Sequence, residues 1–238
     1  MSHAISVRLV QREPVADGVV DVRCQLVDPA RIPFRAGQFM TLAVGKDEAG
    51  RDVRRSYSIA SRTEDADVLR FIVRLLPTGL ASDFWRDLPL GAQVEMTGPH
   101  GFFTLDPQHS GDVVFVATGT GLAPVLPMLA ELSQRREAGR REVYWGLRRE
   151  ADLFVPDEVA AACADAGASL HTYLSRPEDT WSGAQGRITG PVLDALPSFS
   201  SPTFYIVGNG AMIAELKRAL IARGIDRKKH IRTEAFFD

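Results

Sequence analysis

The chain has 238 residues, of which 45% are hydrophobic, enough for a globular core and for one large domain or two ordinary ones. Its formal net charge of −2 gives no overall basis for binding nucleic acid or an anionic membrane surface. No stretch approaches the ~20 apolar residues of a membrane span, and the N-terminus lacks the apolar core of a signal peptide, so we expect a cytoplasmic protein.

The first part of the chain, to about residue 106, alternates apolar and polar residues in short runs, a pattern that predicts β-strands. Six strands are predicted, at residues 5–12, 19–26, 39–44, 53–60, 68–76 and 93–97. Short strands at this spacing favour an antiparallel barrel. One helix is predicted at 79–88, with Leu80, Phe84 and Leu88 on one face, and it would close one end of the barrel.

After a short connector at 103–110, the pattern changes to alternating strands and helices. Strands are predicted at 113–117, 142–146, 169–174, 203–207 and 230–234, and helices at 123–137, 153–166, 189–196 and 211–223. This alternation predicts a doubly wound, five-stranded parallel sheet. We therefore expect two domains, an antiparallel β-barrel over residues 1–106 and an α/β domain over residues 107–238.

The segment from Val113 to Pro124 is an apolar run followed by a Thr/Gly loop and a helical pattern. It predicts a strand, a loop and a helix whose free N–H groups and positive dipole end suit an anion. A tight turn without a ligand would need similar residues. A second glycine-containing loop, Gly208–Met212, follows the predicted strand at 203–207. If the two strands are neighbours, both loops meet at the ligand-binding edge of the sheet, which favours a nucleotide site.

In the barrel part, the segment from Arg54 to Ser61 presents arginines, an aromatic ring and several hydroxyls. Arginine pairs with phosphate, and a tyrosine ring can lie flat on a conjugated ring. A solvated strand would show the same alternation, so this segment alone leaves both interpretations open. The five histidines show no metal-ligand spacing, and Cys24 and Cys163 are too few for an iron–sulfur cluster, so no metal site is expected.

Five segments, in order along the chain, resemble motifs of the ferredoxin–NADP reductase family. Arg55-Ser56-Tyr57-Ser58 resembles the RxYS flavin motif, and Phe34–Phe39 resembles the segment before it. Gly79-Leu80-Ala81-Ser82 resembles the GxxS flavin-pyrophosphate motif. Gly98–Phe103 resembles the GPxGxF that joins the domains, and Thr118–Pro124 resembles the nicotinamide-nucleotide loop. The resemblance covers essentially the whole chain and implies a flavin-binding Greek-key barrel followed by a NAD(P)-binding α/β domain.

The resemblance also implies roles for single residues. Tyr57 would stack on the isoalloxazine and Ser58 would bond near its N5. Phe236, or failing that Phe237, would cover the flavin face where the nicotinamide enters, although both can simply dock the tail. The other implied flavin ligands are Arg55, Ser56, Val73, Arg74, Gly79, Leu80, Ala81 and Ser82. The implied nucleotide ligands are Thr118, Gly119, Thr120, Gly121, Gly208, Asn209 and Met212. The GxxS after RxYS favours FAD over FMN.

The choice of nicotinamide nucleotide depends on charge near its ribose. Ser175-Arg176 and Arg187 resemble pairs that bind the 2′-phosphate in NADP-dependent members, and Arg148 would join them. They favour NADPH over NADH, although Arg176-Pro177 through Gly183 also resembles NADH-dependent oxygenase reductases. One position departs from the family, because Val207 stands where members often have a cysteine near the nicotinamide; hydride transfer is expected to be slower for that reason.

The implied function is hydride transfer between NAD(P)H and FAD, with electrons passed to a separate carrier such as ferredoxin or flavodoxin. Two alternatives remain: a free-flavin or ferric-complex reductase, and an electron-transfer subunit that depends on a larger complex. An acidic partner would need a basic docking face. The candidates for that face are Arg12, Arg51, Arg54, Arg62 and Arg70.

Overall fold

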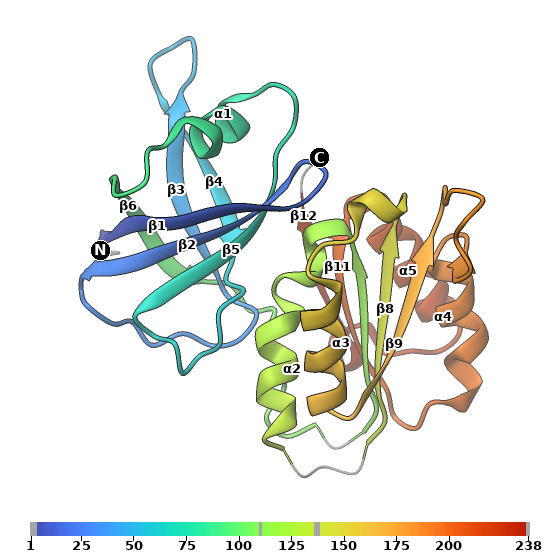
Figure 1. The fold of residues 1–238 in the computed structure, drawn as a ribbon. Coiled ribbons are helices and arrows are strands. Elements are labelled where there is room, and N and C mark those ends of the chain that lie inside the picture. Colours follow the sequence, from blue (N-terminus) through green and yellow to red (C-terminus); the bar gives the residue numbers. More distant parts are fainter. Residues whose placement is uncertain (1–3, 110, 136–138, 237–238) are drawn as a thin grey trace.

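The computed structural model describes residues 4–109, 111–135 and 139–236, and it contains two six-stranded sheets (Figure 1). The first sheet is antiparallel, in the order β4-β3-β6-β1-β2-β5. Its strands are β1 (Ile5–Ala16), β2 (Val19–Asp28), β3 (Phe39–Lys46), β4 (Asp52–Ser58), β5 (Val68–Arg74) and β6 (Gln93–His100). The six strands predicted for this part of the chain, and the antiparallel barrel they imply, are confirmed.

The inward-facing residues of these strands form one apolar core. Leu9, Val22, Met40 and Phe71 are fully buried in it, as the two-residue period of a strand requires. Helix α1 (Leu80–Asp87) adds Trp85 to the same core, and Figure 1 shows the helix at one end of the barrel. The predicted helix at 79–88 is therefore present and packs where the sequence places it.

The second sheet is parallel, in the order β10-β9-β8-β7-β11-β12. Its strands are β7 (Val113–Thr118), β8 (Arg141–Leu147), β9 (Ala168–Leu174), β10 (Ala184–Gln185), β11 (Thr203–Asn209) and β12 (Ile231–Phe236). The helices between them are α2 (Val125–Ser133), α3 (Pro156–Asp165), α4 (Thr189–Ala195), α5 (Gly210–Ala222) and α6 (Arg227–His230). The five predicted strands are all present, and β10, only two residues long, extends the sheet beside β9.

Helices cover both faces of this parallel sheet (Figure 1). Helices α4 and α5 pack against one face of the sheet and form a core with it. Helices α2 and α3 cover the other face, and the core on that side continues into the barrel. That shared core contains Ile72 of the barrel together with Leu126 and Phe154. The two sheets therefore share buried apolar surface. Within the residues described, no helix is long and apolar enough to cross a membrane.

Ionic contacts accompany the apolar ones between the sheets. Arg70 on β5 is 8% exposed, and its Nε donates to Asp21 Oδ2 at 2.9 Å. The same guanidinium reaches across to Glu158 on α3, with Nη2 to Oε2 at 2.8 Å. Asp21 is also buried, so Arg70 is its neutralising partner inside the protein.

We predict that Arg70→Met lowers the free energy of unfolding by ~3–5 kcal/mol, because the buried Asp21 carboxylate would keep only the half-exposed Arg23, 3.9 Å away, as a cation. Glu158→Gln should cost about 1 kcal/mol or less, because the Glu158 side chain is 44% exposed. Arg51→Met removes the exposed pair with Asp47 and is the matched control, with little expected change. Urea unfolding measures all three variants, and equal losses for Arg70→Met and Arg51→Met would contradict the prediction.

Candidate functional site

The carboxyl ends of β7 and β11 meet in a contact that admits only glycine. A Cβ on Gly121 would lie 2.9 Å from the carbonyl oxygen of Val207. A Cβ on Gly208 would lie 2.3 Å from Thr118 Oγ1, and Gly208 has φ +116°. The Asn209 N–H donates to Thr118 Oγ1 at 2.8 Å. The two predicted nucleotide loops are thus adjacent, at the edge where doubly wound sheets bind ligands.

Each of these loops leads into a helix. After β7, residues Gly119–Leu122 form one 3₁₀ turn, and for this reason α2 begins at Val125, two residues later than predicted. At α5, the Asn209 side chain caps the helix by accepting the Met212 N–H at 3.1 Å. Met212 is 4% exposed and packs in the core. Among the predicted nucleotide ligands, Met212 and the Asn209 side chain therefore shape the loop, while the positive end of α5 faces this edge.

Residues predicted to read the ribose phosphate gather at the carboxyl ends of β8 and β9. The Arg176 N–H donates to the Arg148 carbonyl at 2.8 Å, and the Ser175 hydroxyl donates to the Leu147 carbonyl at 3.2 Å. The Gly186 N–H donates to the Leu174 carbonyl at 2.8 Å, and this bond brings the following residue, Arg187, to the same edge. Arg148, Ser175, Arg176 and Arg187 are all exposed. The structure therefore brings all four predicted residues together.

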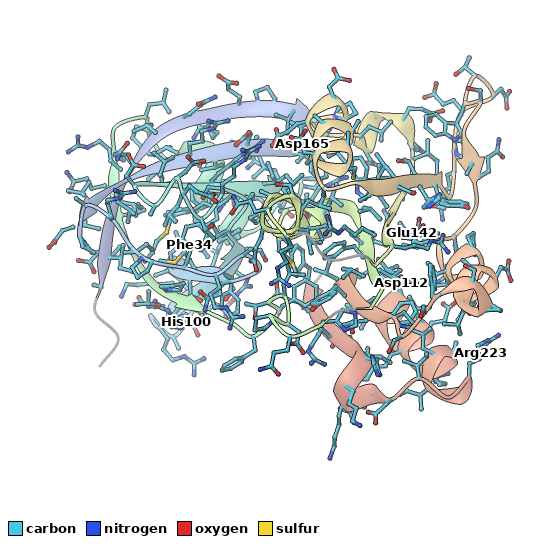
Figure 2. The ribbon with its side chains drawn as sticks, turned by 90° about the horizontal axis from the view of Figure 1, so that it is seen from below. Phe34, His100, Asp112, Glu142, Asp165 and Arg223 are labelled. Carbon is cyan, nitrogen blue, oxygen red and sulfur yellow. The ribbon has the colours of Figure 1, made fainter. Side chains whose placement is uncertain are left out.

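The opposite edge of the parallel sheet, at the amino ends of its strands, carries carboxylates. Figure 2, seen from below, labels Asp112 and Glu142 on the α/β side, at the amino ends of β7 and β8. Asp112 Oδ1 accepts the Arg140 N–H at 2.8 Å and Oδ2 accepts the Ser200 N–H at 2.7 Å. Asp112 thus ties loops together, and Glu142 pairs with Arg140 and His171. Both carboxylates lie at the end of the sheet away from the glycine loops.

On the barrel, the predicted flavin residues follow the edge strand β4. The Tyr57 ring packs edge-on against Trp85, with centroids 5.4 Å apart and an interplanar angle of 86°. It also meets Phe71 at 6.3 Å, and burial raises the pKa of the Tyr57 phenol. Arg55 is exposed, and the Ser56 hydroxyl lies 2.9 Å from Thr41 Oγ1. Tyr57 is thus held in one orientation by the core beneath it.

Helix α1 begins at the predicted pyrophosphate motif, and one of its expected donors is engaged elsewhere. The Ser82 N–H donates to the Gly79 carbonyl at 2.9 Å, and the Ser82 hydroxyl accepts the Leu76 N–H at 2.8 Å. Because the first N–H groups of a helix have no intrahelical acceptor, Leu80 and Ala81 are the donors that suit a phosphate. Ser82 thus has partners in and just before the first turn of the helix, and its contact with the flavin phosphates stays a prediction.

Two further predicted flavin neighbours, Val73 and Arg74, have contacts with other parts of the protein. Val73 is 4% exposed and belongs to the barrel core. Arg74 Nη1 lies 3.0 Å from Asp152 Oδ1, so it links β5 to the α/β part of the protein. The sequence placed both residues correctly on the strand but could not show that Arg74 has an acidic partner 78 positions later.

The residue that sequence analysis missed is Glu234. The Ser58 hydroxyl donates to Glu234 Oε1 at 2.9 Å, joining the flavin motif to β12. Within the parallel sheet, Glu234 lies opposite Val207 at the nucleotide edge. Burial raises the pKa of Glu234, although the bond from Ser58 acts to lower it. The sequence held one signal that Glu234 lies near the flavin site. It comes two positions before Phe236, the residue predicted to cover the flavin, and residues two apart on a strand share a face.

Strand β12 also positions Phe236, which pairs in register with Asn209 and packs against the shared core. Because Phe236 shares a face of β12 with Glu234, it is directed to the same side as the Ser58 contact. Phe237, the second candidate, lies outside the described residues. A groove of about 360 Å³, lined in part by Phe39, Phe103 and Glu234, opens beside this contact.

Two of the five arginines of the predicted basic docking face are engaged within the protein, while Arg51, Arg54 and Arg62 are exposed. Arg70 is buried between Asp21 and Glu158. Arg12 donates to the carbonyl oxygens of Trp85 and Leu88 at 2.7 Å each. Neither guanidinium is available to an acidic partner.

Comparisons with known proteins agree with this geometry. Two family models match, an oxidoreductase FAD-binding domain over residues 6–105 and an oxidoreductase NAD-binding domain over residues 115–218. The chain is 30% identical to ferredoxin–NADP reductase B of Sorangium cellulosum over 96% of each protein. It is 31% identical to the propane 2-monooxygenase reductase component of Gordonia sp. over 66% of this chain, but spans only 44% of that protein.

Among solved structures, the Amycolatopsis cytochrome P450 reductase GcoB has a TM-score of 0.85 at 27% identity, over 98% of this chain and 70% of that one. Both domain models match the chain, and a ferredoxin–NADP reductase is similar to it over nearly the whole length of both proteins. The fold and the paired glycine loops are consistent with these matches. The chain belongs to the ferredoxin–NADP reductase family.

Proposed function

We propose that this protein transfers hydride from NADPH or NADH to FAD and passes the electrons to a separate redox protein. The observation that carries the proposal is the Ser58–Glu234 hydrogen bond. It joins the serine of the flavin motif to the strand whose residue 234 lies opposite Val207, at the edge of the nucleotide loops. A hydride enzyme needs its two rings held face to face, and this contact sets the two predicted sites side by side.

The residues present fit a bound flavin. Tyr57 would offer a ring fixed by Trp85, Ser58 would offer a hydroxyl oxygen whose proton is donated to Glu234, and Phe236 would cover the flavin ring. Arg55 and the N–H groups of Leu80 and Ala81 suit the flavin phosphates. FAD supplies the hydride acceptance itself, and the protein binds, orients and shields the ring.

The nucleotide would lie on the parallel sheet. The loop from Thr118 to Gly121 and the loop at Gly208 would take its pyrophosphate, because Gly121 and Gly208 let the two backbones approach closely. Arg148, Arg176 and Arg187 would read the 2′-phosphate. The division into domains at residues 106 and 107, and a location in the cytoplasm, stay predictions.

The separate acceptor is the part of the proposal that depends most on relatives. Named relatives include the reductase component of propane 2-monooxygenase and component C of methane monooxygenase, and one is a ferredoxin–NADP reductase. By analogy the acceptor here would be a ferredoxin, a flavodoxin or an oxygenase component. A free-flavin reductase, the alternative, would lose its flavin during purification, whereas tightly bound FAD would leave the protein yellow.

We predict that anaerobic mixing of the FAD-loaded protein with NADPH bleaches the flavin absorbance in stopped flow. NADH, mixed in parallel, should reduce it more slowly. A flavin spectrum that neither nucleotide changes would contradict hydride transfer and favour a subunit that acts only within a complex. A tenfold preference for NADH (~1.4 kcal/mol) would contradict the assignment of Arg176 and Arg187.

Arg176→Ala should lower kcat/KM for NADPH about tenfold, ~1.4 kcal/mol, and leave NADH within about twofold, because only NADPH carries the 2′-phosphate. Arg223→Ala is the matched control: it removes an exposed arginine beyond the end of α5 (Figure 2). Both variants are assayed with the two nucleotides. Equal losses for NADPH and NADH in Arg176→Ala would show that the residue does not read the 2′-phosphate.

Glu234→Gln keeps an oxygen for the Ser58 hydroxyl and removes the buried charge. Because burial raises the pKa of Glu234 above its usual 4.5, the folded protein retains this proton longer than the unfolded chain, and stability falls as pH rises through that window. The variant should therefore be more stable than wild type at about pH 8 and gain less at about pH 5. Urea unfolding at the two pH values measures the difference.

Glu64→Gln is the control with opposite sign. The hydrogen bond from Gln134 lowers the pKa of Glu64, so its contribution is present at neutral pH and is lost in acid. Glu64→Gln should be less stable than wild type at about pH 7, and the difference should disappear as the pH falls below the usual pKa of a glutamate. A gain for Glu234→Gln that is independent of pH would contradict the raised pKa.

A further inference from the structure

Arg187, one of the three arginines at the ribose edge, already has an anionic partner. Its Nη2 lies 2.6 Å from Glu215 Oε2. Glu215 comes from α5, the helix that begins at the nucleotide loop after β11. The two residues are 28 positions apart, so the pair is formed by the fold and has no local sequence pattern.

The Glu215 carboxylate is held by more than the arginine. Its second oxygen, Oε1, accepts a hydrogen bond from the Thr189 hydroxyl at 3.0 Å. Thr189 is 6% exposed and is the first residue of α4, whereas the Glu215 side chain is 48% exposed. An ordinary surface pair has two mobile partners and contributes little. Here a buried hydroxyl fixes the carboxylate, and the carboxylate in turn fixes Arg187.

The net positive charge at this edge is therefore smaller than the three arginines alone would give. A backbone bond joins Arg176 to Arg148, and the Gly186 N–H, just before Arg187, donates to the carbonyl of Leu174, two residues before Arg176. The carboxylate of Glu150 is also near these loops, where it accepts the Glu178 N–H at 3.1 Å. Of these acids, Glu215 is the one paired directly with an arginine of the set. A phosphate that used Arg187 would have to share or displace this carboxylate and would meet its negative charge.

We propose that Glu215 is a specificity-determining residue that limits the preference of this protein for the 2′-phosphorylated nucleotide. It competes with the phosphate for Arg187 and repels the phosphate charge. A 2′-hydroxyl has no such charge and does not compete. The proposal rests on the proposed nucleotide site, and it makes the NADPH/NADH ratio a property of Glu215 as well as of the arginines.

The test uses Glu215→Gln in the FAD-loaded protein and two fragments that carry no nicotinamide, adenosine 2′,5′-bisphosphate and 5′-AMP. Glutamine keeps an oxygen for Thr189 and removes the charge. Calorimetry at low salt should show about tenfold tighter binding of the bisphosphate, ~1.4 kcal/mol, with 5′-AMP changed less than about twofold. The gain should shrink as salt is raised, because exposed charges are screened.

Two comparisons make the result specific. Asp83→Asn removes an exposed carboxylate paired with Arg86 on α1 and should leave both fragments unchanged. In an Arg187→Ala background, most of the gain from Glu215→Gln should disappear. A full gain in that background would overturn the route through Arg187. Unchanged or weaker bisphosphate binding in Glu215→Gln would overturn the proposal itself.

Failure of the proposed function is distinguishable from failure of this inference. If the protein transfers no hydride, wild-type flavin stays unbleached with either nucleotide, whatever the fragments do. If Glu215 has no influence on specificity, bleaching proceeds while the bisphosphate affinity of Glu215→Gln matches wild type. Parallel stopped-flow reduction of wild type and Glu215→Gln by NADPH and NADH completes the comparison.

Discussion

The contact between the ends of β7 and β11 determines where every part of the site can lie. With Gly121 against the Val207 carbonyl and Gly208 against Thr118, the two strands end side by side, and the Thr118 hydroxyl bridges them by accepting the Asn209 N–H. Strand β12 is then placed by its pairing with β11, which sets Glu234 opposite Val207. Ser58 meets Glu234 from the barrel. A backbone contact at one edge of the sheet thus fixes the position of a hydrogen bond between the two sheets.

That relationship depends on the two sheets holding one arrangement. The apolar core that contains Ile72, Leu126 and Phe154 runs through both. Beside this core, Arg70 neutralises Asp21 and reaches Glu158, and Arg74 pairs with Asp152. Apolar burial supplies the general attraction, whereas the charged pairs have directional geometry. The two sheets are therefore both attached and oriented, as a site built between them requires.

Sequence reasoning succeeded where the information is local. The glycine loops, the Arg55–Ser58 strand and α1 each follow from a few consecutive residues, and the arginines gather because parallel strands end at one edge. It failed where a partner comes from a distant element. Arg74, Glu234 and Glu215 meet residues 28 or more positions away. The two-residue β10 has no periodicity of its own and exists because β9 offers it hydrogen bonds.

The place of β12 in the chain has a consequence for biosynthesis. Protein domains begin to fold from the N-terminal side while the chain is still being made, at about 5–20 residues per second. The barrel strands end at His100, so their core can close well before residues 231–236 leave the ribosome. During that interval Ser58 has no Glu234 to bind. A cofactor captured by the nascent barrel would therefore meet one wall of its final pocket, and the second wall would arrive only with the last strand.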